Sequence, residues 1–137
     1  MSLIHAEFSA GIGTITLQHQ AKRNCLSGEM VGEILSALEE FEKQSAIAVI
    51  IRAEKDAKVW SAGHDVHELP KPGRDPLPYA GPLESLLRRM QEFPGAVIAL
   101  VQGSVWGGAC DLAFSCDILI GDDSASFAMT PAKIGIP

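Results

Sequence analysis

Residues 96–121, AVIALVQGSVWGGACDLAFSCDILIG, contain the pattern that decides the fold. The run begins with an unbroken apolar stretch, which predicts a buried strand over 96–101. A glycine-bearing turn follows at 103–108, after which the spacing predicts a short helix over 108–115 and another strand over 117–121. Strand, helix and strand in this order are typical of a parallel sheet with helical crossovers.

The same alternation occurs earlier in the chain. Residues 12–18 (IGTITLQ) carry β-branched side chains and predict a strand, and 46–52 (AIAVIIR) form an apolar run typical of a strand covered on both faces. Between them, apolar residues at helical spacing predict an amphipathic helix over 28–44, with Ser27 as its N-cap. Residues 83–93 predict a second helix of this kind. The chain is therefore expected to form a largely parallel α/β sheet.

A proline-rich stretch separates the two cycles. Residues 70–82 (PKPGRDPLPYAGP) contain five prolines and two glycines, which exclude a continuous helix or a central strand. Long irregular segments in small domains are more often functional than idle, so this loop is expected to cover a ligand.

Length and composition limit the classes of function. The 137 residues suffice for one domain, and 47% of them are hydrophobic, which allows a buried core. A net charge of −6 disfavours a nucleic-acid partner, and no apolar run is long enough to span a bilayer. Three cysteines without a C-x-x-C pair, and no secretory signal after Met1, predict reduced thiols in a cytoplasmic protein.

Two glycine-bearing segments follow the predicted buried strands, where ligands collect in open α/β sheets. They are 61–65 (SAGHD) and 103–109 (GSVWGGA). Backbone N–H groups from two such turns, converging on one oxygen, would form an oxyanion hole. The alternatives are a plain tight turn at 103–109, or a dinucleotide-binding turn with Asp122 as the ribose-binding acid. The second alternative is disfavoured because the first cycle has no glycine-rich turn.

Titratable residues near these segments allow fewer roles. His64 and His67 are spaced like a metal pair, but no third ligand is evident, so no metal is expected. Asp111 has two equally acceptable interpretations, namely a general acid or base, or a first-turn helix acid favoured by the helix dipole. The chain contains no G-x-S-x-G motif, which disfavours a serine hydrolase.

The segments SAGHDVHEL at 61–69 and GSVWGGACDLAFSCDILI at 103–120 resemble the two signature loops of the crotonase (enoyl-CoA hydratase/isomerase) superfamily. This resemblance implies a spiral of ββα units, a coenzyme A thioester as substrate and no separate cofactor. It also implies trimers or dimers of trimers. In the superfamily pattern, the backbone N–H groups at His64 and Gly108 form the oxyanion hole. The coenzyme A moiety would lie against Arg23, Cys25, Ala62, Asp65 and Val66.

The segments SAGHDVHELPKPGRDPLPY at 61–79, GSVWGGA at 103–109 and FAMTPAKIGIP at 127–137 narrow this resemblance. Together they resemble the methylmalonyl-CoA decarboxylase branch of the superfamily, which converts that thioester to propionyl-CoA. Hydratases use two glutamates, whose positions here correspond to Asp111 and Pro131. A missing second carboxylate argues against hydration, whereas loss of carbon dioxide produces an enolate without removal of a C–H proton. Thr130 is then a candidate hydrogen-bond donor to the departing carboxylate, and Trp106 is a candidate apolar wall or a packing residue.

Two rival interpretations are retained. One is an enoyl-CoA hydratase or isomerase that uses Asp111. The other is a non-catalytic module that binds coenzyme A or oligomerises. Superfamily members are considerably longer, so the chain is expected to be an N-terminal part of the core domain, 1–137, that lacks the C-terminal helical region. As it stands it is expected to be weakly active or inactive.

Overall fold

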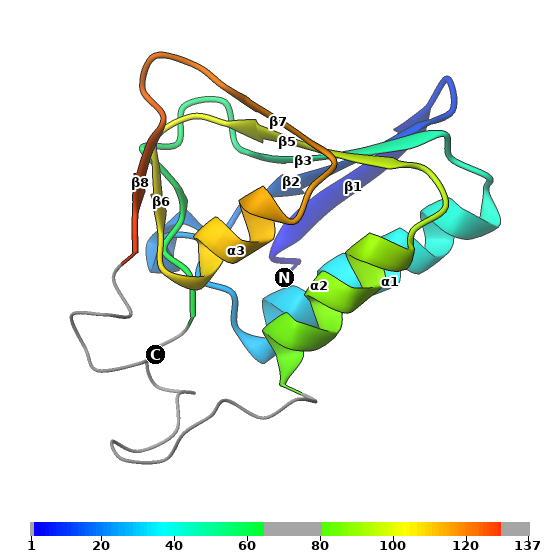
Figure 1. Ribbon diagram of the computed structural model, residues 1–137, viewed down its shortest axis with the longest axis horizontal. Coiled ribbons are helices and arrows are strands. Elements are labelled where there is room, and N and C mark those ends of the chain that lie inside the picture. Colours follow the sequence, from blue (N-terminus) through cyan, green and yellow to red (C-terminus); the bar gives the residue numbers. More distant parts are fainter. Residues whose placement is uncertain (1, 65–80, 130–137) are drawn as a thin grey trace.

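The computed structural model of the protein describes residues 2–64 and 81–129 (Figure 1). Asp65, Val66, His67, Thr130 and Pro131, with most of the proline-rich stretch, therefore lie outside the described residues. The elements, in chain order, are β1 (Ile4–Ser9), β2 (Ile12–Leu17), the 3₁₀ turn η1 (Gln20–Lys22), α1 (Gly28–Lys43), β3 (Ala48–Ala53), β4 (Val59–Ser61), α2 (Pro82–Glu92), β5 (Ala96–Val101), β6 (Ser104–Trp106), α3 (Gly108–Phe114), β7 (Ile118–Gly121) and β8 (Ser126–Ala128).

The strands form two sheets. The larger sheet has the order β1-β2-β3-β5-β7, in which β1 is antiparallel to β2 and every other neighbouring pair is parallel. The smaller sheet has the order β4-β6-β8 and is parallel throughout. Each of β3, β5 and β7 is followed by a short strand of the smaller sheet, and Figure 1 shows β6 and β8 at the left, steeply inclined to β5 and β7. The predicted α/β class with a largely parallel sheet is confirmed.

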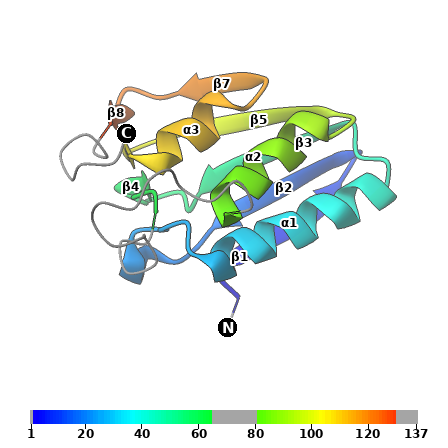
Figure 2. The ribbon, with the colours of Figure 1, turned by 60° about the horizontal axis from the view of Figure 1, so that its bottom comes forward.

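The α-helices of the described residues, α1, α2 and α3, lie on one face of the larger sheet (Figure 2). The predicted N-cap of α1 is confirmed, because the Ser27 hydroxyl accepts a hydrogen bond from the Met30 amide at 3.1 Å. Its apolar stripe, including Ile34, Leu38 and Phe41, is buried against the sheet. The core of the molecule therefore lies between this helical layer and the larger sheet.

The expectation that 46–52 is covered on both faces is wrong for this chain. In β3, Val49 and Ile51 are buried whereas Ala48 and Ile50 are half-buried, and β5 alternates in the same way. The physical reason is that the described helices cover one face only, so alternate side chains face away from them. An unbroken apolar run therefore marks a strand here without marking how many of its faces are covered.

One hydrogen bond and one close backbone contact fix the join between the two sheets. The indole Nε1 of Trp60, on β4, donates to the Leu100 carbonyl oxygen on β5 at 2.8 Å, and the Trp60 side chain is fully buried. At the β5–β6 corner, Gly103 has φ +76° and packs so closely on Lys58 that a Cβ would overlap the Lys58 carbonyl oxygen. Only glycine satisfies both conditions, and the corner brings the end of β6 beside the end of β4. Across the part of the chain described, no helix is both long and apolar enough to cross a membrane.

Candidate functional site

The first glycine-bearing segment follows β4 and is fastened to an earlier loop. The Ala62 amide donates to the Arg23 carbonyl oxygen at 2.9 Å, and the Leu26 amide donates to the Gly63 carbonyl oxygen at 2.6 Å. Gly63 itself has φ +85°, a conformation that L side chains rarely adopt. The path of the chain into His64 is therefore set by main-chain contacts on both sides of it.

The second segment follows β6 and turns directly into α3. Gly107 is the N-cap of α3, with φ +57°, and its amide donates to the Ala128 carbonyl oxygen on β8 at 2.9 Å. Gly108 is the first helical residue, and N–H groups at that position have no partner within the helix. The turn thus uses the Gly107 amide for the sheet and leaves the Gly108 amide for an external acceptor.

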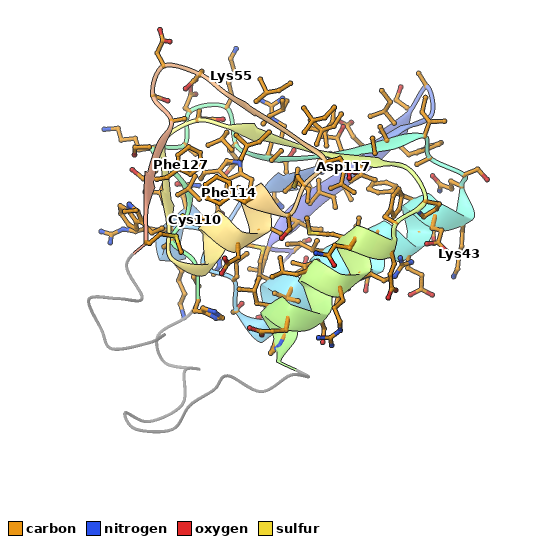
Figure 3. All side chains as sticks on the ribbon, in the orientation of Figure 1. Lys43, Lys55, Cys110, Phe114, Asp117 and Phe127 are labelled. Carbon is orange, nitrogen blue, oxygen red and sulfur yellow. The ribbon has the colours of Figure 1, made fainter. Side chains whose placement is uncertain are left out.

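Side-chain contacts hold α3 in place against the smaller sheet. The Phe114 ring stacks on Phe127 of β8 with centroids 5.4 Å apart, and Figure 3 shows the two rings side by side. The Cys110 thiol lies 3.5 Å from the Val105 carbonyl oxygen and is fully buried. Burial is also the main reason that the pKa of Cys110 is raised, so this cysteine has a packing role.

The two glycine-bearing segments touch one another. A Cβ placed on Gly63 would lie 2.9 Å from the Gly108 amide nitrogen and would overlap the carbonyl oxygen of Trp106. Adding standard bond lengths to that 2.9 Å distance puts the amide nitrogens of His64 and Gly108 at most about 7 Å apart. Two donors that each lie ~2.7–3.1 Å from one shared oxygen are separated by no more than about 6 Å. The upper limit of about 7 Å lies slightly above this separation, so the contact brings the two amides close to the spacing that an oxyanion hole requires.

Side chains from two elements cover Gly108. A Cβ at this position would lie 2.8 Å from the Leu83 Cδ2 atom on α2, and 2.9 Å from Cδ2 and 3.1 Å from Nε2 of His64. The imidazole of His64 thus packs over the first turn of α3. The backbone amide of the same residue is the other donor of the predicted oxyanion hole. A side chain larger than hydrogen at position 108 would have to displace this ring or Leu83.

Asp111 lies in the first turn of α3, close to this contact. Asp111 is exposed, but partial desolvation of its carboxyl raises the pKa above the ordinary value. Attraction by His64 partly opposes this rise in pKa, and repulsion by Glu84 on α2 adds to it. The carboxyl therefore holds its proton to a higher pH than a free aspartate does. Such a shift suits a proton donor, and it is opposite in direction to the shift that a favourable helix dipole alone would cause.

Four other site candidates, Arg23, Cys25, Ala62 and Trp106, lie in the described residues. Cys25 is buried and Arg23 is exposed in the loop that contacts Ala62, and Ala62 is half-buried. Trp106, at the end of β6, is half-buried. Asp65, Val66 and Thr130 are outside the described residues, so their predicted roles stay predictions.

Four further residues shape the site although the sequence reasoning did not single them out: Asn24, Ser61, Leu83 and Glu84. Leu83 was expected only as part of a helix face. Asn24 and Ser61 bond to partners far away in the sequence, and Glu84 acts from another helix. No local pattern predicts such contacts.

Comparison with known proteins gives a consistent result. The chain is 40% identical over 126 residues to methylmalonyl-CoA decarboxylase of Escherichia coli (strain K12), a match that covers 92% of this chain and 48% of that protein. It is 32% identical over 124 residues to a probable mitochondrial enoyl-CoA hydratase of Dictyostelium discoideum, covering 90% of this chain and 44% of that one. The chain therefore spans about half the length of these relatives.

Solved structures agree. Methylmalonyl-CoA decarboxylase complexed with 2S-carboxypropyl-CoA superposes with a TM-score of 0.94 at 37% identity, over 100% of this chain and 52% of that one. Human enoyl-CoA hydratase domain-containing protein 3 superposes with a TM-score of 0.85 at 31% identity, over 98% of this chain and 54% of that one. The expected crotonase fold is thereby confirmed. Because residues 7–137 also match the family described as Enoyl-CoA hydratase/isomerase, this chain belongs to the enoyl-CoA hydratase/isomerase family.

Proposed function

We propose that this chain carries the thioester-binding half of an acyl-CoA enzyme, in which the amides of His64 and Gly108 stabilise a thioester enolate. The supporting observation is the contact between the two glycine-bearing turns, with the Gly108 nitrogen 2.9 Å from a Cβ position on Gly63. Backbone donors fixed in this way need no reorganisation as charge develops on the oxygen. One such donor typically changes turnover by about 10²–10³-fold.

The reaction that we favour is decarboxylation of methylmalonyl-CoA to propionyl-CoA. The bond between the α-carbon and the carboxylate breaks, carbon dioxide leaves, and the electron pair moves into the thioester as an enolate. The enolate then takes a proton at the α-carbon. Asp111, whose pKa is raised by partial desolvation, is the proposed proton donor, with water restoring its proton afterwards. Thr130 and Trp106 are the proposed contacts of the departing carboxylate.

The choice of decarboxylation depends on the carboxyl groups available. In the superfamily pattern, Asp111 corresponds to the first glutamate of hydratases and Pro131 to the second. A residue without a titratable group cannot activate water, whereas decarboxylation needs only the enolate to be stabilised. The similarity to a methylmalonyl-CoA decarboxylase supports the same choice.

A second candidate is an enoyl-CoA hydratase or isomerase that relies on Asp111 alone, favoured by the similarity to proteins with hydratase names. The two reactions separate by assay, because one releases carbon dioxide from methylmalonyl-CoA and the other consumes the enoyl absorbance of crotonyl-CoA. A non-catalytic module that binds coenzyme A would give neither signal. Contact of coenzyme A with Arg23, Cys25, Ala62, Asp65 and Val66 is part of the proposal. So are the absence of a separate cofactor, a homotrimer or dimer of trimers, and a cytoplasmic location.

The oxyanion hole can be tested with a matched pair of substitutions at Gly108. Both Gly108→Ala and Gly108→Pro add a Cβ next to Leu83 and His64, but only proline removes the N–H. Proline is favoured at the first helical position, and the preceding Gly107 tolerates the restriction that proline imposes, so the fold should survive.

The readout is the affinity for an enolate mimic relative to that for neutral propionyl-CoA, measured by calorimetry. A suitable mimic is 2-nitronate-propionyl-CoA, which occupies a solved structure of methylmalonyl-CoA decarboxylase. We expect the alanine variant to keep the preference for the anionic mimic. The proline variant should lose about 10²-fold of it or more. Equal preferences in the two variants would contradict the proposed role of the Gly108 amide.

A further inference from the structure

Two residues are both polar and fully buried in the part of the chain described: Asn24 and Ser61, each 0% exposed. Neither belongs to the proposed oxyanion pair or to the proposed coenzyme A contacts. Buried polar groups are costly unless they are hydrogen-bonded, so their partners show what the two side chains hold together.

Asn24 joins two segments of the chain. Its Oδ1 atom accepts a hydrogen bond from the His19 amide at 2.7 Å, which closes the loop of residues 19–26. Its Nδ2 atom donates to the Trp60 carbonyl oxygen at 3.0 Å, on the strand that leads to the proposed oxyanion loop, residues 61–64. One amide side chain thus satisfies a donor in its own loop and an acceptor 36 residues away.

Ser61 completes the connection from the other side. Its hydroxyl donates to the Asn24 carbonyl oxygen at 2.7 Å and accepts from the Gly63 amide at 3.2 Å. Main-chain bonds from Ala62 to Arg23 and from Leu26 to Gly63 lie on either side of this hydroxyl. Residues 19–26 cannot shift relative to residues 61–64 without breaking several of these bonds together.

The loop of residues 19–26 is also strained. Arg23 and Asn24 have φ +53° and +51°, and neither is a glycine. A left-handed conformation costs most L-residues about 1–2 kcal/mol, and asparagine tolerates it better than arginine does, so the surrounding bonds hold Arg23 in particular in it. Arg23 is itself a proposed contact of coenzyme A, and Asn24 is next to another proposed contact, Cys25.

We propose that Asn24 and Ser61 are positioning residues that make loops 19–26 and 61–64 one mechanical unit, so that binding of the nucleotide end of coenzyme A fixes the His64 amide. The inference rests on the proposed function. It explains how remote binding energy could be used at the thioester, where an amide that is free to move would stabilise an enolate less well.

The test uses adenosine 3′,5′-bisphosphate, which carries the nucleotide end of coenzyme A but no arm that reaches the thioester position. Amide hydrogen exchange of the ¹⁵N-labelled 137-residue chain is followed by NMR with and without this probe. Calorimetry with coenzyme A establishes binding separately. We expect the saturated probe to slow exchange of the Gly63 and His64 amides by about 10-fold or more in the parent chain.

Four variants distinguish coupling from simple structural support. Ser61→Ala and Asn24→Gly should still bind the probe but lose the slowing of exchange at the His64 amide. Glycine at position 24 keeps the positive φ, so Asn24→Gly serves if Ser61→Ala fails to fold. Ser61→Thr, which retains a hydroxyl, should restore the effect. Ser126→Ala, an exposed position on β8, should behave like the parent chain.

The outcomes separate the two proposals. If coenzyme A does not bind the parent chain, the proposed function fails and the coupling fails with it. If coenzyme A binds and the probe leaves exchange at His64 unchanged, the coupling alone is overturned. Retention of the full effect in both Ser61→Ala and Asn24→Gly would likewise overturn it.

Discussion

Gly63→Ala tests the contact between the two turns most directly. The substitution adds a single methyl group at the point where the segments meet. That methyl group would overlap the Trp106 carbonyl oxygen and lie 2.9 Å from the Gly108 nitrogen and 3.3 Å from the Ala109 nitrogen. All three atoms belong to the backbone, so no side-chain rotation can relieve the overlap. The two turns have to move apart.

The expected cost follows from two terms. Gly63 has φ +85°, and a left-handed conformation costs a non-glycine residue about 1–2 kcal/mol. Inserting a methyl group into a packed interior typically costs about 1–3 kcal/mol. The free energy of unfolding should therefore fall by about 2–5 kcal/mol, a large fraction of the ~5–15 kcal/mol that stabilises an ordinary domain.

Urea unfolding followed by tryptophan fluorescence measures this loss. The matched control is Gly32→Ala, also a glycine-to-alanine change, because a Cβ on Gly32 meets nothing within 4 Å and Gly32 is exposed in the middle of α1. The control should gain about 0.8–1 kcal/mol from helix propensity. A Gly63→Ala variant as stable as the parent chain, with unchanged preference for the enolate mimic, would refute the claim that the two turns are in contact.

Three other predictions follow from particular groups. Because the pKa of Asp111 is raised, the fold disfavours its carboxylate, and this loss of folding stability develops as the pH rises from the unfolded-state pKa through the folded-state pKa. In urea unfolding, Asp111→Asn should therefore be more stable than the parent chain near pH 7 and no more stable near pH 2. Burial, aided by Asp117, raises the pKa of Cys116 to about 12. Because only the thiolate reacts, iodoacetamide at pH 8 should label Cys116 about 10³-fold more slowly in the folded chain than in the unfolded chain. Mass spectrometry of the labelled peptides measures this ratio. Trp60→Phe removes the donor to the Leu100 carbonyl oxygen and should lower the free energy of unfolding by about 1–3 kcal/mol, whereas an unchanged value would mean that this bond does not join the sheets.

The longer elements could be predicted because their signals are local. The helix expected over 28–44 is observed as Gly28–Lys43, and the strand expected over 96–101 has the same bounds in the structure. Each has enough residues for a periodicity to show, and α1 also has a side-chain cap. Such features depend on residues only a few positions apart.

The short elements could not be predicted because they are defined by their neighbours. Strands β4, β6 and β8 have three residues each, too few for an alternating pattern, and they exist because they pair with one another. The edge strand β1 buries only Ile4, so its sequence shows no alternation. The Asn24 and Ser61 side chains were missed for a related reason, since their bonds join positions 36 and 37 residues apart.

The smaller sheet explains why two turns so far apart in sequence meet. Strands β4 and β6 run parallel, with Val59 opposite Ser104 and, after a register shift between Val59 and Ser61, Ser61 opposite Val105. Both strands therefore leave the sheet at the same edge. The residues just beyond that edge are Ala62-Gly63 on one strand and Gly107-Gly108 on the other. Parallel pairing alone would place them side by side, and glycine at each turn lets the backbones close to contact. The proposed oxyanion hole is thus a consequence of strand register, and a shift of one residue between β4 and β6 would separate the two amides even if every residue of the site were retained.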